Sequence, residues 1–207
     1  RRTSNEIIPA SPMREMRRCV ELLAYAALYR PAGLRYAYGL PLRRALRRGD
    51  WAGAVGDDFS ADIPLHRVGR WRSGVGARAL ARLADFQLET RQLASRRISR
   101  LQQIAGVEVL TDTEGNEGTW PFLMVLMPSS SARDRALQTL WSAGLGVSRL
   151  FIHALPDYAY LSDCVPAADV PQARDFAGRT LTISNSPWLD DTDFGHIVRV
   201  IEEPSGQ

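Results

Sequence analysis

The sequence predicts an α+β fold, in which helices pack on a small, mostly antiparallel sheet that is preceded by one long bracing helix. Two observations favour this fold. Apolar residues recur at helical spacing over residues 77–105. After Gly106, short stretches alternate between strand-like and helix-like patterns in the order β-β-α-β-α-β-α. With 45% hydrophobic and 24% charged residues among 207, the composition is that of a globular protein.

A helix is expected over residues 12–29, because Ser11 and Pro12 form a start signal and Pro31 stops the pattern. This helix mixes arginines with apolar and aromatic residues, as a helix at a membrane interface does. We favour the alternative, in which it packs on a missing domain. Further along, the sequence predicts a short basic helix over residues 41–48 and a loop over residues 53–72.

The second half of the chain is predicted to form short helices and strands that end at glycines or prolines. Residues 144–158 form a strand-like run in which Arg149, Phe151 and His153 share one side, either on a solvated sheet face or on the wall of a binding cleft. The other strands are expected at 107–111, 119–127 and 180–184, and the helices at 131–143, capped by Ser131, 171–178 and 190–202.

Charge is distributed unevenly along the chain. Residues 1–100 contain 20 arginines and 9 acidic residues, whereas residues 101–207 contain 6 arginines and 14 acidic residues. This asymmetry suggests two regions with different partners. No motif of a nucleic-acid-binding protein is present, so nucleic acid is not an expected partner. A scaffold that binds a polyanion through the basic half stays open as an alternative.

Several classes of protein and site are not expected. The two cysteines and three histidines have no metal-ligand spacing, which disfavours a zinc site, and two reduced thiols favour a cytoplasmic protein. No apolar run reaches the roughly 20 residues of a membrane span, and no signal peptide is visible. The sequence contains no lysine, so none of its side chains can form a Schiff base with a carbonyl cofactor.

Two long segments carry a resemblance to a known family. "WPFLMVLMPSSSARDRALQTLWSAGLGVSRLFIHALPDYAYL" and "PQARDFAGRTLTISNSPWLDDTDFGHIVRVI" resemble the C-terminal domain of the DegT (DegT/DnrJ/StrS) family of pyridoxal-phosphate-dependent sugar aminotransferases. Upstream, "RWRSGVGARALARL" is similar to the loop that opens the long helix in that family. It departs from the family pattern at Arg70, Val75 and Ala77. The resemblance covers residues 57–203.

The resemblance implies the small C-terminal domain of a fold-type I PLP aminotransferase. In the family, a lysine binds pyridoxal 5'-phosphate (PLP), an aspartate pairs with its ring nitrogen and an aromatic residue stacks on it, all in the N-terminal large domain. None of those segments is present, so we expect the C-terminal half of such an enzyme, without its lysine-bearing N-terminal half. Residues 1–72 are then assigned to the missing large domain, 73–106 to a connecting helix and 107–207 to the small domain.

The resemblance also implies site residues. Arg72 matches an arginine that reaches across a homodimer interface toward the cofactor phosphate, although an exposed structural arginine is an equal alternative. His153 and Tyr158 fall in a substrate-facing segment, where the alternative for His153 is a structural imidazole. Trp188 is interpreted as core or interface packing.

The implied activity is amino transfer to a keto-sugar nucleotide or similar carbonyl compound in polysaccharide or secondary-metabolite biosynthesis. The chain alone is expected to be inactive. The alternatives are a lysine-free homologue without catalysis and the polyanion-binding scaffold.

Overall fold

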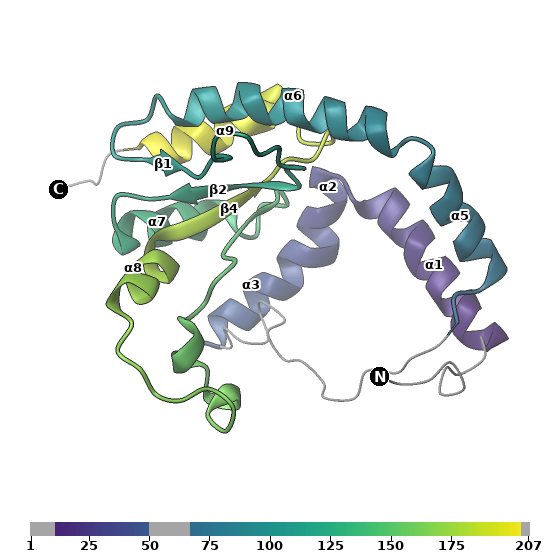
Figure 1. The fold of residues 1–207 in the computed structure, drawn as a ribbon, viewed down its shortest axis with the longest axis horizontal. Helices are drawn as coiled ribbons and strands as arrows, with labels where there is room; N and C mark the ends of the chain where they lie inside the picture. The colour runs from purple at the N-terminus through teal and green to yellow at the C-terminus, as the bar shows by residue number, and fades with distance from the viewer. Residues whose placement is uncertain (1–10, 50–66, 204–207) are drawn as a thin grey trace.

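The computed structural model describes residues 11–49 and 67–203 (Figure 1). The expected N-terminal helix is confirmed: it begins after Ser11 and ends before Pro31, which opens the next helical segment. The predicted basic helix is the last part of a longer helical run, and the predicted loop 53–72 lies mostly outside the described residues. The N-terminal elements are α1 (Pro12–Leu28), α2 (Pro31–Leu34), the π-helical segment η2 (Arg35–Gly39) and α3 (Leu40–Arg47).

The prediction of one continuous helix over residues 77–105 is wrong in extent. The chain forms two helices, α5 (Arg70–Leu80) and α6 (Leu83–Leu101). Between them Arg82 leaves helical geometry, with φ −108° and ψ 4°. Gly106 has φ +75°, a conformation that glycine adopts without strain, and it follows the helix end by several residues. Helix α6 packs on the core and braces it as expected, and α5 continues from it away from the core (Figure 1).

The sheet has four strands and is antiparallel throughout, in the order β1-β2-β4-β3. The central pair is β2 with β4, in which Leu123 lies opposite Ile183 and Val125 opposite Leu181. The strands are β1 (Glu108–Val109), β2 (Phe122–Leu126), β3 (Val147–Ser148) and β4 (Thr180–Ser184).

The strand-like run over residues 144–158 is shorter than predicted. Within this run the strand register with β4 covers Val147 and Ser148, and the Gly146 carbonyl before them accepts from the Ser184 amide at 2.8 Å. Beyond them the Arg149 guanidinium donates to the carbonyl oxygens of Phe151, at 3.1 Å, and Ile152, at 2.5 Å. These side-chain bonds turn the chain away from the sheet, so Phe151 and His153 are not on a regular strand face. Two short 3₁₀ turns follow, η3 (Leu155–Asp157) and η4 (Ala159–Leu161).

Three helices complete the fold: α7 (Ser130–Leu140), α8 (Pro171–Arg179) and α9 (Asp191–Glu202). The cap of α7 differs from the prediction, because the Ser129 hydroxyl, not that of Ser131, accepts a hydrogen bond from the Ala132 amide at 3.1 Å. At α9 the Asp190 carboxylate accepts from the Asp193 amide at 2.8 Å. Such caps satisfy backbone donors that have no partner within the helix.

One apolar core joins the sheet to its helices. It includes residues that are fully removed from water on both central strands, on α6, on α7 and on α9: Leu101, Leu123, Leu140, Leu181, Ile183, Phe194 and Ile197. Leu42 of α3 belongs to the same cluster. The N-terminal helices therefore reach the core at α3, while the assignment of residues 1–72 to a separate large domain stays a prediction.

Two glycines allow the N-terminal helices to approach the C-terminal unit closely. A β-carbon at Gly39 would lie 2.3 Å from the Ser142 carbonyl oxygen. A β-carbon at Gly144, which has φ +82°, would lie 2.4 Å from the Pro31 carbonyl oxygen. Both distances are far inside van der Waals contact, so the backbones meet here because neither residue has a side chain.

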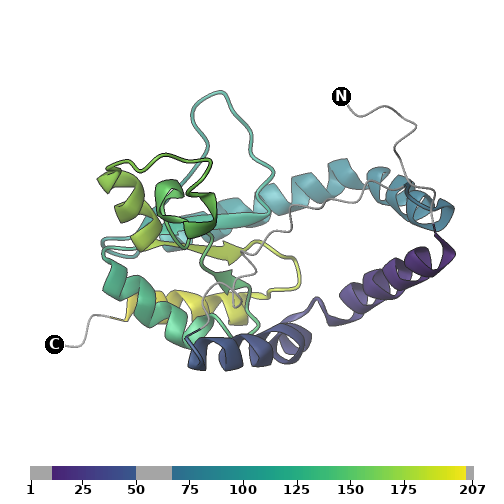
Figure 2. The ribbon, with the colours of Figure 1, turned by 90° about the horizontal axis from the view of Figure 1, so that it is seen from below.

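Helices α1 and α5 form an arm that extends away from the core. Figure 2 shows α1, α2 and α3 along one edge of the molecule, with α5 lying beside α1. Among the described residues, neither α1 nor α5 has a buried side chain. The arm is joined by an ion pair between Glu15 of α1 and Arg72 of α5.

Candidate functional site

A groove of about 790 Å³ lies between the C-terminal end of α1, α2 and one end of the sheet. This volume is in the range of ligand sites, and such sites combine apolar walls with a few polar groups. Here the polar groups include Glu21, Arg30 and Thr182. The aromatic side chains that line the groove are Tyr25, Tyr29, Tyr38, Phe122, Trp141 and Trp188.

Trp188 and Arg30 close one side of this groove. The Arg30 guanidinium carbon lies 4.8 Å from the centroid of the Trp188 ring, which is cation–π geometry. Trp188 is 52% exposed, so the interpretation as a core residue is wrong. Its indole lines the groove, and the stack joins the start of α2 to the turn after β4. Tyr38 also lines the groove, and burial raises the pKa of its hydroxyl.

The turn that carries Trp188 is held by a buried arginine of α6. The Arg97 guanidinium donates to the Asn185 side-chain oxygen at 3.1 Å, to the Ser186 carbonyl at 3.3 Å and to the Leu189 carbonyl. Its ring partner is Phe194, at 5.1 Å from the guanidinium carbon. Burial lowers the pKa of Arg97 to about 10, so the side chain stays charged at neutral pH.

Asn185 also holds the turn that carries Trp188. Its side-chain amide donates to the Thr90 carbonyl at 2.8 Å and to the Trp120 carbonyl at 3.0 Å. One buried amide therefore links α6, the end of β4 and the segment before β2. No sequence pattern marks Arg97, Asn185 or Arg30 as site residues, because the partner of each is distant along the chain.

The predicted phosphate ligand, Arg72, lies in the first turn of α5. Its guanidinium donates to both carboxylate oxygens of Glu15, through Nε at 3.0 Å and through Nη2. The hydrogen bond with Glu15 raises the pKa of Arg72. Arg72 also lines a cavity of about 300 Å³ that shares Glu21 and Tyr25 with the large groove. The geometry is the two-point recognition of an oxyanion by arginine, with a carboxylate in place of a phosphate.

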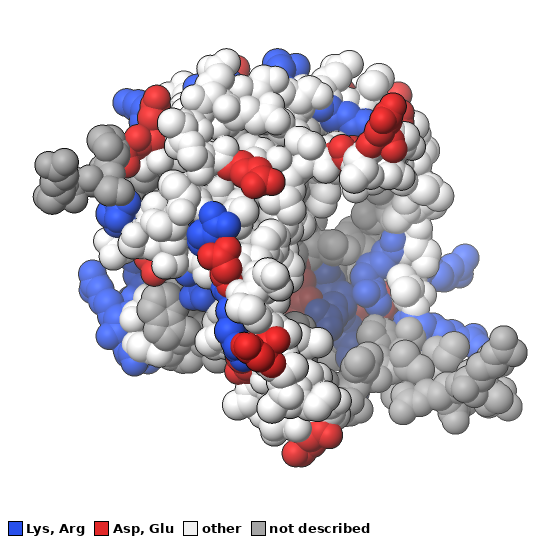
Figure 3. Space-filling view, turned by 60° about the vertical axis from the view of Figure 1, so that its left-hand side comes forward, with Lys and Arg blue, Asp and Glu red and all other residues white. Residues whose placement is uncertain are grey.

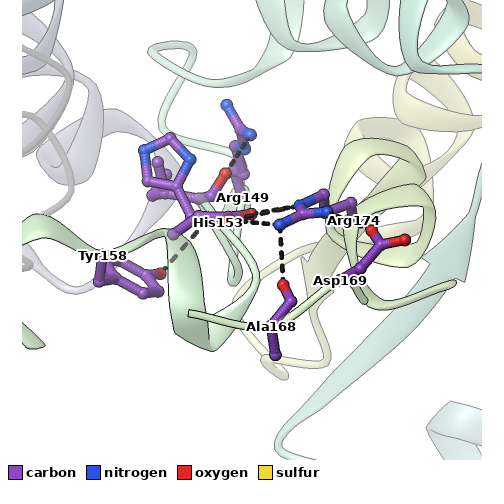
Figure 4. A network of polar contacts seen from close by, with 8 residues as sticks. Arg149, His153, Tyr158, Ala168, Asp169 and Arg174 are labelled. Atoms are coloured by element: carbon purple, nitrogen blue, oxygen red, sulfur yellow. Dashed lines mark hydrogen bonds and ion pairs between the residues drawn. The ribbon is translucent and has the colours of Figure 1, made fainter. Parts of the chain in front are cut away.

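The predicted substrate residues, His153 and Tyr158, lie together on the segment after β3 (Figure 4). Their rings meet edge to face with centroids 5.4 Å apart, and the His153 amide lies 3.5 Å from the Tyr158 hydroxyl. His153 is exposed. Neither residue lines the large groove. Figure 1 shows this segment on the opposite side of the molecule from α5, so within this chain they do not form one site with Arg72.

An ion-pair cluster holds the segment of His153 and Tyr158 against α8. Arg174 donates to both oxygens of Asp157, at 2.9 Å from each of two guanidinium nitrogens, and to Asp169 at 3.0 Å (Figure 4). It also donates to the Ala168 carbonyl at 3.2 Å. The hydrogen bond from Arg174 lowers the pKa of Asp157. The cluster positions the loop and leaves the His153 imidazole accessible.

Within the described ranges 11–49 and 67–203, no group of three His, Cys, Asp or Glu side chains is arranged to hold a metal ion. In the same ranges, no helix is both long and apolar enough to cross a bilayer.

A family model gives the family of the chain, and two solved structures give its fold. The family model for the DegT/DnrJ/EryC1/StrS aminotransferases matches residues 66–202. The aminotransferase TlmJ from Streptoalloteichus hindustanus is similar in structure, with a TM-score of 0.50 and 23% identity over 62% of this chain and 34% of that chain. 3-Amino-5-hydroxybenzoic acid (AHBA) synthase is similar with a TM-score of 0.55 and 16% identity over 75% of this chain and 47% of that chain.

No curated protein sequence matches the chain. The chain spans less than half the length of either solved structure. At these identities the two structures establish the fold, which confirms the small α+β domain with its antiparallel sheet and bracing helices. Because the family model covers about two thirds of the sequence, the chain belongs to the DegT/DnrJ/EryC1/StrS aminotransferase family.

Proposed function

We propose that this chain is the C-terminal part of a PLP-dependent aminotransferase that acts on a keto-sugar nucleotide or a similar carbonyl compound. The observation that carries the proposal is the family match over residues 66–202 together with the small-domain fold. In the proposal the enzyme is a cytoplasmic homodimer of polysaccharide or secondary-metabolite biosynthesis. Residues 1–72 contact the large domain, 73–106 connect the two domains and 107–207 form the small domain.

The residues of this chain do not fit a covalently bound cofactor. The sequence contains no lysine, and no other side chain supplies a primary amine. The cofactor would therefore be bound through an amine outside these 207 residues, and PLP bound there would supply the electron-withdrawing ring on which amino transfer depends. The two solved structures extend well beyond the region that this chain covers, which leaves room for such a lysine.

In the proposal Arg72 binds the cofactor phosphate. It already holds a carboxylate at two points, so its guanidinium is oriented for an oxyanion. Phosphate binding requires Arg72 to exchange Glu15 for the phosphate. His153 and Tyr158 bind the substrate in this proposal. The imidazole and the phenol form hydrogen bonds with the hydroxyl groups of the sugar.

The test uses the complete product of the gene, whose mass is first compared with the 23.0 kDa of this chain. Glutamate and a nucleotide-linked 4-keto sugar are supplied, and formation of 2-oxoglutarate is measured. We expect PLP-dependent turnover. A product with no lysine that binds the sugar without turnover would instead support a non-catalytic homologue, and strong salt-dependent retention on heparin without turnover would support the polyanion scaffold.

The role of Arg72 has a matched control in Arg70, an exposed arginine two residues earlier on α5. Arg72→Ala is expected to raise the Kd for PLP about tenfold, the effect of losing roughly one charge-assisted contact, whereas Arg70→Ala leaves it unchanged. Equal effects of the two substitutions would contradict the assignment. For the substrate residues, Tyr158→Phe with His153→Gln is expected to raise KM for the sugar, and the exposed His196→Gln on α9 leaves it unchanged.

A further inference from the structure

The groove of about 790 Å³ takes no part in the roles proposed for Arg72, His153 and Tyr158, since none of these residues lines it. One wall is the C-terminal end of α1 with α2, and the other is one end of the sheet with the turn after β4. The first wall, within residues 21–38, lies outside the residues 66–202 that the family model matches. The family match therefore does not assign a ligand to this groove.

The two walls are held together by contacts within this chain. Leu42 of α3 belongs to the core, and the Arg43 guanidinium donates to the Ser142 hydroxyl at 2.6 Å. Pro31 and Gly144 both line the groove, and a β-carbon at Gly144 would lie 2.4 Å from the Pro31 carbonyl oxygen. The shape of the groove is thus set by these residues, and a site that is formed in advance costs less to occupy.

A missing large domain has another side of α1 to contact. Met13, Met16 and Val20 are between 58% and 70% exposed and follow one row of the helix, spaced i, i+3 and i+7. Glu21 and Leu28 line the groove on a second row, about 100° further around the helix axis. The large domain can cover the first row without entering the groove.

The groove has one cation whose charge is not balanced within the described chain. Arg30 lies over the Trp188 ring at 4.8 Å, and no carboxylate of the described residues is paired with it. The carboxylate of Glu21, which also lines the groove, is paired with Arg17 at 3.0 Å and Arg18 at 2.6 Å. The face drawn in Figure 3 differs, because blue and red side chains lie next to one another along its middle.

These features define the chemistry of a ligand. Aromatic side chains on both walls, among them Tyr29 and Trp188, suit a planar ring, because stacking tolerates any ring with a π-face. A guanidinium over an indole still has its in-plane N–H groups for an anion. The hydroxyl groups of Ser148 and Ser184 at the groove suit the polar edge of a heterocycle.

Building on the proposed function, we propose that the groove binds the nucleotide part of the keto-sugar nucleotide. The base lies among the aromatic side chains, and Arg30 binds a phosphate of the diphosphate. An aromatic carboxylic acid shares the planar ring and the anion. A single ring with one carboxylate is much smaller than 790 Å³, whereas a nucleoside diphosphate is of the size that such sites enclose.

The test is calorimetric titration of the complete gene product with uridine and guanosine diphosphates, without PLP or glutamate. We expect at least one to bind. Arg30→Ala is expected to raise its Kd about tenfold, whereas Arg35→Ala, at an exposed arginine that does not line the groove, leaves it unchanged. Trp188→Leu is expected to raise the Kd at least about fivefold, and Trp71→Leu, at a residue 49% exposed on α5, leaves it unchanged.

A variant that fills the groove separates a ligand from a protein occupant. Ala24 is exposed and lines the groove, so Ala24→Trp adds an indole there. We expect this variant to lose nucleotide binding and to keep its Tm. If the large domain fills the groove, the unsubstituted protein binds neither nucleotide and Ala24→Trp lowers the Tm, which overturns the proposal. Binding of 3-hydroxybenzoate that depends on Arg30, with no nucleotide binding, also overturns it.

Amino transfer is measured on the same proteins. Nucleotide binding that depends on Arg30, without turnover, would support the groove and contradict the proposed activity. Turnover with the same nucleotide Kd in the unsubstituted protein and in Arg30→Ala would support the activity and overturn the role of the groove.

Discussion

The unit around the sheet and the arm of α1 and α5 are stabilised by different interactions. In the unit around the sheet, side chains from every core-facing element are removed from water, and the buried polar groups Arg97 and Asn185 have several partners. In the arm no described side chain of either helix is buried, and an ion pair between Glu15 and Arg72 joins the two helices. Helices of this length are marginal in water alone. Regular secondary structure therefore does not by itself indicate that a region is stable on its own.

The largest loss of stability is expected when a buried side chain is removed from the core. Phe194 of α9 is fully buried and contacts the guanidinium groups of Arg97 and Arg100 with its ring. Phe194→Ala is expected to lower the free energy of unfolding by about 3–5 kcal/mol. Phe86→Ala, at a residue 50% exposed on α6, is expected to cost about 0.5 kcal/mol. Urea denaturation measures both, and similar losses would mean that burial does not distinguish the two sites.

The second prediction concerns the buried amide of Asn185. Asn185→Ala leaves the Thr90 and Trp120 carbonyls and the Arg97 guanidinium each without one partner. We expect a loss of about 2–3 kcal/mol in the free energy of unfolding. Asn116→Ala is the control, because Asn116 makes an exposed hydrogen bond to Thr113 and is expected to matter little. A neutral Asn185→Ala would show that the turn after β4 is held without this side chain.

The third prediction concerns the ion pair between Glu15 and Arg72 in the arm. Glu15→Ala and Arg72→Ala are each expected to speed amide hydrogen exchange in α1, because each removes the pair that joins α1 to α5. The effects of the two single substitutions should not add in the double variant, since Glu15 and Arg72 pair with each other. Amides of α6 near Leu101 serve as the internal reference and should be unaffected. Uniform acceleration across both regions would contradict the distinction between them.

The smallest expected effect is at the ion-pair cluster after β3. Hydrogen bonding by Arg174 holds the pKa of Asp157 below 3.8, so this pair stabilises the folded state above the normal pKa and loses that contribution as pH falls through the lowered one. Arg174→Gln is expected to return the Asp157 pKa toward 3.8, as measured by NMR titration. Arg179→Gln, which breaks the separate pair with Asp175, should leave it unchanged.

Much of the fold could be predicted from local pattern. The strand β4 and the helices α1, α8 and α9 lie within one or two residues of their predicted bounds, since proline, capping residues and apolar periodicity mark their ends. The break near Arg82 could not be predicted, because alanine, arginine and leucine around it all favour helix. The early end of β3 depends on the Arg149 side chain replacing ladder bonds, which no periodicity reveals.

Less of the candidate site than of the fold could be predicted from the sequence. Tyr158 and His153 are neighbours along the chain, so their contact follows from proximity. Arg72 and Glu15 are 57 residues apart, and Arg30 meets Trp188 across most of the chain. Contacts of this kind depend on tertiary packing. A sequence pattern can suggest that arginine and tryptophan are functional types, but it does not say which pairs meet.

The close approach at Gly39 and Gly144 bears on how this protein can diverge. Both glycines lie where the helices after α1 contact the turn before β3. A methyl group added at either position would collide with a carbonyl oxygen. A library of random variants selected for soluble expression should therefore tolerate many changes at the exposed apolar residues of α1 and almost none at these two glycines. A side chain at either position would force the two backbones apart, so the contact between the N-terminal helices and the C-terminal unit depends on both glycines.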